Sequence, residues 1–196
     1  VDSVAAEVAG IDGVDNVIVA ENAAYKNMVA ENITQAVLAV QEADAYSHII
    51  FPATNNGKNI MPRVAVKLDV AGISDITEVV DEATFVRPTY AGNAMATVKS
   101  LDDVKVMTVR ATAFEKSDTG AGPAPVATAA EAAMPDAGLT QFVAEELVAS
   151  DRPELTTASV VVAGGRGVKS IEGFAVMEEL ADKLNAAMGE IGRASC

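Results

Sequence analysis

Early in the chain, a short run rich in β-branched residues is twice followed by an amphipathic stretch. Residues 14–20 precede a helical pattern at 31–44, and residues 47–53 precede another at 60–68. Val and Ile favour strands, whereas apolar residues spaced three and four apart predict helices. Parallel strands need a long crossover between them, which is usually a helix. The sequence therefore predicts an α/β fold in which helices cover a parallel sheet.

The loop before the second of these helices carries several turn-forming residues. Residues 55–58, Asn-Asn-Gly-Lys, are predicted to form a turn that opens the helix at Ile60. Pro62 then lies in the first helical turn, where a missing N–H costs little. Read as a phosphate-binding loop instead, residues 54–58 would suit a nucleotide-binding regulatory module.

The pattern changes over residues 73–111. Four short β-type runs follow one another there, separated by acidic or glycine-containing turns. We expect them to form an antiparallel meander added to the parallel sheet. Arg87, Tyr90 and Arg110 lie within these runs, and strand residues of this type are usually structural or interface contacts. The four runs are residues 73–80, 84–90, 94–99 and 104–111.

Composition divides the rest of the chain. Residues 117–138 are rich in Ala, Gly, Pro and Thr without periodicity, which predicts a flexible linker or long surface loop. Residues 141–148 fit either a strand or a short helix. A charged turn at 150–154 then marks a change of composition. We therefore expect one domain over residues 1–149 and a second that begins at 150 and continues to 196.

Charge and residue counts exclude several classes of site. A net charge of −14 argues against nucleic acid or an anionic membrane surface as a partner. No stretch reaches the roughly 20 apolar residues of a membrane span, so we expect a protein that is not embedded in a membrane. With His48 and Cys196 each the sole residue of its type, neither a disulfide framework, a metal site nor a catalytic triad is expected.

The stretch Val160–Ser170 holds three glycines around one arginine, after a run of valines. It predicts a strand, a tight turn and a helix, and such a turn brings backbone N–H groups close to an anion. Two known loops fit poorly, because Val168 replaces the glycine of a P-loop and Ser170 the third glycine of a dinucleotide loop. Anion binding and a simple structural turn both remain open. The expected apolar face of the helix comprises Phe174, Met177, Leu180, Ala181, Leu184 and Met188.

Three motifs spread over about 110 residues together resemble the α subunit of electron-transfer flavoproteins, and so does nearly the whole chain up to Met188. The first motif is Asn56–Ala65, and the second is Phe85–Ala94. The third combines the turn at 150–156 with residues 161–167, Val-Val-Ala-Gly-Gly-Arg-Gly. Their order and spacing also agree. Ala163 stands where many members of the family have serine.

The resemblance implies an electron carrier rather than a substrate-converting enzyme. Members of the family pair an α with a β subunit around one FAD. They accept electrons from acyl-CoA and related dehydrogenases and pass them to a quinone oxidoreductase, in the bacterial cytoplasm or the mitochondrial matrix. The resemblance also implies an N-terminal α/β domain, followed here by the first β-α unit of a flavodoxin-like FAD-binding domain. Arg166 would contact FAD, while Gly165 and Gly167 would shape the loop.

Other elements of the family's flavin site are absent from this sequence. The resemblance implies a second arginine beside the isoalloxazine, a Gln-Thr-Gly turn, a Gly-rich loop and late Asn and Asp residues, and we do not find these motifs after Met188. It also implies a first strand of the N-terminal domain that we expect to precede this sequence. We therefore expect a chain truncated at both ends that binds FAD weakly or not at all by itself. Residues 190–196 could derive from a translated sequencing adapter. Besides the regulatory module, a pure interaction subunit without cofactor contact stays open as an alternative.

Overall fold

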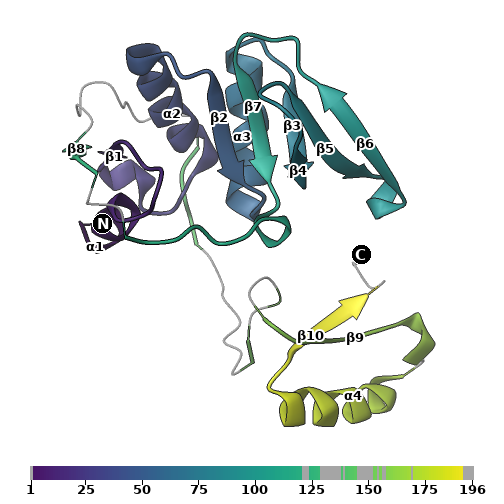
Figure 1. Cartoon of the computed structure of the whole chain (residues 1–196). Helices are drawn as coiled ribbons and strands as arrows, with labels where there is room; N and C mark the ends of the chain where they lie inside the picture. The colour runs from purple at the N-terminus through teal and green to yellow at the C-terminus, as the bar shows by residue number, and fades with distance from the viewer. Residues whose placement is uncertain are drawn as a thin grey trace. The chain divides into compact units, whose positions relative to one another are not determined.

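The computed structural model describes residues 2–120, 124–128, 138, 140–144, 152–153, 155, 158–168 and 170–191 (Figure 1). The chain forms two compact units, residues 1–143 and 144–196, which are considered separately below. Over the described residues, every helix is too short or too polar to cross a lipid bilayer.

The first unit is built on a three-stranded parallel sheet in the order β2 (His48–Pro52), β7 (Lys105–Val109), β3 (Gly72–Ile76). Helix α3 (Asn55–Lys67) packs against all three strands, and α2 (Ala30–Asp44) packs against α3 (Figure 1). The predicted parallel sheet with covering helices is thus confirmed.

Strand β7 connects two hydrophobic clusters because its side chains alternate between the faces of the sheet. Val106 contributes to a cluster with Ile60 and Val64 of α3. Met107, the next residue, contributes to a second cluster with Ile73, Ile76 and Phe85. The core of the first unit therefore lies on both sides of this one strand.

The prediction of an antiparallel meander was right for part of the segment and wrong for the rest. Strands β4 (Glu78–Val79), β5 (Thr84–Thr89) and β6 (Ala94–Lys99) form an antiparallel sheet. However, the run at 73–80 divides into β3 and β4, and the run at 104–111 becomes β7, in the middle of the parallel sheet. The physical reason is that Val106, Met107 and Thr108 are all buried, as in a strand covered on both faces.

Helix α3 begins earlier than predicted. It starts at Asn55, and the Thr54 side chain caps it by accepting a hydrogen bond from the Gly57 N–H at 3.3 Å. Residues 55–58 are thus helical, and Pro62 lies in the helix interior instead of the first turn. Proline at this position leaves the carbonyl of Lys58 without its usual helical donor.

A separate pair of strands in the first unit corrects the prediction of a linker at 117–138. Within that segment β8 (Val126–Thr128) pairs in parallel with β1 (Val17–Val19). Helix α1 (Asp2–Ala9) contacts both strands. Residues 121–123, 129–137 and 139 lie outside the described residues, as do 145–148 of the predicted element at 141–148. The described residues of this unit also form short 3₁₀ helices at Ala23–Tyr25, Tyr90–Gly92 and Ala111–Ala113.

The second unit contains the predicted strand, turn and helix. Strand β9 (Val161–Gly165) leads through a 3₁₀ turn, η5 (Arg166–Val168), into α4 (Ile171–Leu184). Met188 was expected on the helix, but it lies in β10 (Ala187–Ile191), which pairs in parallel with β9 (Figure 1). Asn185 ends α4 by adopting a left-handed conformation with φ 48°. Of the suspected adapter residues, 190 and 191 belong to β10, and 192–196 lie outside the described residues.

Candidate functional site

The glycine-rich turn lies at the carboxyl end of β9. Gly165 is the last residue of the strand, where it is paired with Ile191, and Arg166 and Gly167 begin η5. Ligands of open parallel sheets bind at the carboxyl ends of strands. The fold therefore places Gly165, Arg166 and Gly167, the three predicted site residues, where a ligand would be expected.

Two other glycines fix the shape of this turn, and sequence reasoning had not assigned them a role. A Cβ on Gly164 would lie 2.5 Å from Cε of Met177, so the flexible end of that side chain would have to move. A Cβ on Gly173 would lie 2.5 Å from the carbonyl oxygen of Val168, so glycine allows η5 to fold back on the start of α4. In the sequence, the only indication of such a role was that Gly164 and Gly173 lie on either side of the turn.

Gly167 differs from these packed glycines. Gly167 is exposed, and a Cβ added to it would meet no described atom within 4 Å. The backbone at the centre of the turn is thus open to approach. Arg166 precedes Gly167 in the sequence, and an arginine together with exposed backbone N–H groups would suit a phosphate-bearing group. The residues present fit this part of an FAD site.

Arg152 has a structural role at the C-terminal end of α4. Its Nε and Nη2 donate to Oδ1 of Asp182 at 3.0 and 2.7 Å, and its Nη1 lies 3.0 Å from the sulfur of Met188. The charged turn before β9 is in this way fastened to α4 and β10.

His48 also takes part in structure. Its Nδ1 lies 2.9 Å from Oγ of Ser47, and its Nε2 lies 2.7 Å from the carbonyl oxygen of Glu82. Within the described part of the chain no three His, Cys, Asp or Glu residues are grouped as metal ligands.

The possible phosphate loop at residues 54–58 is the capped first turn of α3. The Gly57 N–H already has the Thr54 hydroxyl as acceptor, and Gly57 is buried against β2. Lys58 follows on the exposed side of this turn. The loop therefore acts as a helix start, and the position of Lys58 becomes relevant to a pocket described below.

The three residues singled out in the β-rich segment have different environments. Arg110 binds Asp75 with both ends of its guanidinium group, Nε donating to Oδ1 at 3.1 Å and Nη2 to Oδ2. Tyr90 is 84% exposed. Arg87 donates from Nη2 to Oγ of Ser74 at 2.7 Å. Arg110 thus has a structural ion pair, whereas Arg87 points into a pocket.

The ion pair predicts a pH dependence of stability. The hydrogen bonds from Arg110 hold the pKa of Asp75 below its ordinary value. A carboxylate with a lowered pKa stabilises the fold at pH 7, and this contribution is lost as the pH falls below about 4. Because the Arg110 side chain is 44% exposed, we expect no more than about 1 kcal/mol.

Asp75→Asn tests this expectation in the full-length protein. Asp75 has φ 63°, a conformation that Asn tolerates well. Urea denaturation at pH 7 and pH 3 should show that wild type loses about 1 kcal/mol more of its unfolding free energy than the variant does. Equal losses in both proteins would contradict the proposed linkage.

Two family models match the chain. A family model described as the electron transfer flavoprotein domain matches residues 1–134, and one described as the electron transfer flavoprotein FAD-binding domain matches residues 154–195. A protein of Pseudomonas aeruginosa named electron transfer flavoprotein subunit alpha is 51% identical over 187 residues, covering 95% of this chain and 59% of the relative.

Relatives from other organisms carry the same name. The Paracoccus denitrificans protein is 53% identical, with 94% of this chain and 58% of the relative covered. A mitochondrial protein of Dictyostelium discoideum is 46% identical, with 95% and 56% covered. The chain thus spans somewhat more than half the length of the curated relatives it matches. Because the first family model alone matches well over half of the chain, the chain belongs to the electron transfer flavoprotein family.

Proposed function

We propose that the full-length protein to which this chain corresponds is the FAD-binding α subunit of an electron-transfer flavoprotein. It is an electron carrier rather than a substrate-converting enzyme. The observation that carries this proposal is the match of the FAD-binding family model to residues 154–195, the segment that forms β9, the glycine-rich turn and α4.

We propose that the second domain, and not the first, binds the cofactor. Residues 1–149 form the N-terminal domain, and residues 150–196 begin the FAD-binding domain. The two compact units and the separate extents of the two family models support this division. When bound, FAD supplies the redox chemistry, so the protein has to bind and orient it.

Within the site, Arg166 is proposed to bind an anionic or ring portion of FAD, with Gly165 and Gly167 holding the turn open. The support is the position of these residues at the carboxyl end of β9 and the open backbone at Gly167. A planar guanidinium can make two parallel hydrogen bonds to a phosphate, which an ammonium group cannot reproduce.

Arg166→Gln tests this assignment in the full-length protein assembled with its partner subunit. Losing a hydrogen bond to a charged group should raise the dissociation constant for FAD about 10- to 100-fold. Arg166→Lys should restore part of the affinity, because it keeps the charge but not the planar pair of donors. Flavin absorbance after dialysis against defined FAD concentrations gives the constants.

Lys183→Gln is the matched control, since it removes one positive charge from the same unit. Lys183 is 70% exposed and pairs with Glu179 on α4 at 2.7 Å. FAD affinity should stay unchanged in this variant. Unaltered flavin content in Arg166→Gln would instead favour the alternative of an interaction subunit whose turn does not touch the cofactor.

An electron carrier of this family needs a partner subunit, an electron donor and an electron acceptor, and we propose one class of protein for each. These are an electron-transfer flavoprotein β subunit, acyl-CoA and related dehydrogenases as donors, and a quinone oxidoreductase as acceptor, in a bacterial cytoplasm or mitochondrial matrix. Mixing the FAD-loaded heterodimer with an acyl-CoA dehydrogenase and its substrate should bleach the flavin absorbance. A flavin that stays oxidised with every such dehydrogenase would contradict this role while leaving FAD binding intact.

A further inference from the structure

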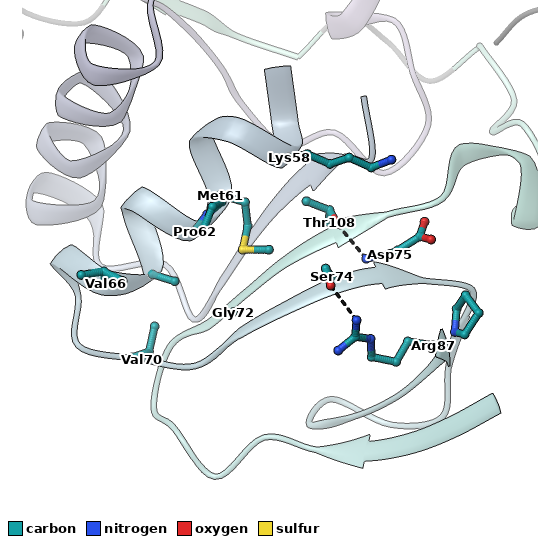
Figure 2. A pocket seen from close by; sticks show the side chains of 12 residues that line it. Lys58, Met61, Pro62, Val66, Val70, Gly72, Ser74, Asp75, Arg87 and Thr108 are labelled. Atoms are coloured by element: carbon teal, nitrogen blue, oxygen red, sulfur yellow. Dashed lines mark hydrogen bonds between the residues drawn. The ribbon is translucent and has the colours of Figure 1, made fainter. Parts of the chain in front are cut away.

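The first unit contains a pocket of about 540 Å³ that is separate from the glycine-rich turn. It lies between α3 and the strands β3, β5 and β7 (Figure 2). Its volume falls within the range of about 300–1,000 Å³ that is usual for small-molecule sites.

The pocket has an apolar end and a polar end. Figure 2 shows Val66 and Val70 at one end, with Met61 beside them. Lys58, Asp75 and Arg87 lie toward the other end. A ligand that fits both ends would combine an apolar body with a charged group.

The charge at the polar end is positive overall. Asp75 is already neutralised by Arg110, which holds it through two hydrogen bonds. Lys58 and Arg87 both act on the carboxylate of Asp75 as further positive charges and lower its pKa. Lys58 has no salt bridge to any described residue. Two cations therefore face one carboxylate that has its own counterion.

The guanidinium of Arg87 has an unused donor. Its Nη2 donates to Oγ of Ser74 at 2.7 Å (Figure 2), but its Nε is buried and has no hydrogen-bond partner in the described structure. Buried donors are nearly always paired, and an unpaired one in a pocket calls for an acceptor. Because this Nε has almost no exposed surface, an oxyanion in the pocket would supply that acceptor after a small shift of the Arg87 side chain.

We propose that this pocket binds a small organic anion, with its phosphate or carboxylate group at Lys58 and Arg87 and its apolar body against Met61, Val66 and Val70. The site belongs to the N-terminal domain and does not depend on the proposed FAD contact at Arg166. It would give that domain a ligand of its own.

Phenyl phosphate and benzoate serve as probes, with benzyl alcohol as the uncharged control. They are titrated by calorimetry into the full-length protein, assembled with its partner subunit and saturated with FAD. We expect at least one of the two anions to bind and benzyl alcohol not to bind. Lys58→Gln and Arg87→Gln should each weaken binding about tenfold or more, because each removes one charge-assisted contact.

Lys99→Gln is the matched control, because Lys99 is an exposed cation on the neighbouring strand β6 and does not line the pocket. It should leave anion binding unchanged, and flavin absorbance should stay the same in all variants. Lys58 is exposed, so its variant should fold even if Arg87→Gln does not. Absence of anion binding, or equal binding by wild type and Lys58→Gln, would overturn the proposal.

Discussion

Gly57→Ala should destabilise the first unit by about 3 kcal/mol, the upper part of the usual range for overpacking. A Cβ at this position would lie 1.9 Å from the carbonyl oxygen of Pro52 and 3.4 Å from Cβ of Phe51. The oxygen is backbone at the end of β2, so α3 and the strand would have to separate. Alanine's better helix propensity, about 1 kcal/mol, offsets only part of this cost.

Urea denaturation of the full-length protein, followed by circular dichroism, measures this effect. Gly10→Ala is the matched control, since its Cβ would make ordinary contacts of 3.5 and 3.8 Å with the carbonyl oxygens of Glu7 and Ala6. Its unfolding free energy should stay within about 0.5 kcal/mol of wild type. Equal stability of both variants would show that α3 does not pack on β2 as closely as described.

Phe85→Ala should cost about 3–5 kcal/mol, the range for emptying a buried aromatic site. Phe85 is 2% exposed and packs with Ile73, Ile76 and Met107 in the second cluster. This cluster joins the antiparallel sheet to the parallel one, because Phe85 belongs to β5 and the other three to β3 and β7. The cavity would therefore loosen the attachment between the sheets.

Leu101→Ala is the control for this second prediction. Leu101 is 89% exposed, so its truncation should change the unfolding free energy by no more than about 0.5 kcal/mol. Both variants are compared in the full-length protein by urea denaturation. A Phe85→Ala protein as stable as Leu101→Ala would show that the sheets are held together by other contacts.

Local patterns accounted for much of the candidate site. Val160–Ser170 predicted a strand, a turn and a helix, and β9, η5 and α4 follow in that order. A β-branched run, a group of glycines and a helical periodicity each depend on neighbouring residues, so they can be read from sequence. The end of the helix was placed too late, because Met188 continues the apolar periodicity although Asn185 ends α4.

The environment of Arg87 could not be read in the same way. The sequence places Arg87 in a β-type run, but it does not show which residue the Arg87 side chain contacts. Its hydrogen bond to Ser74 and its place in the same pocket as Lys58 depend on the packing of β5 beside β3, which itself packs against α3. Lys58 and Arg87, nearly thirty positions apart in the sequence, line one pocket only because of the strand order.

The α/β class, the glycine-rich turn with Arg166 and the resemblance to the electron-transfer flavoproteins can all be read from the sequence, because they rest on local patterns or ordered motifs. The tertiary structure alone decided that β7 enters the parallel sheet between β2 and β3. It also decided that Gly57 lies against Pro52 and that Lys58 and Arg87 share a pocket. The physical reason is that strand order and the packing between layers depend on which residues far apart in the sequence are buried against one another. The residues of any single segment give little information about those contacts.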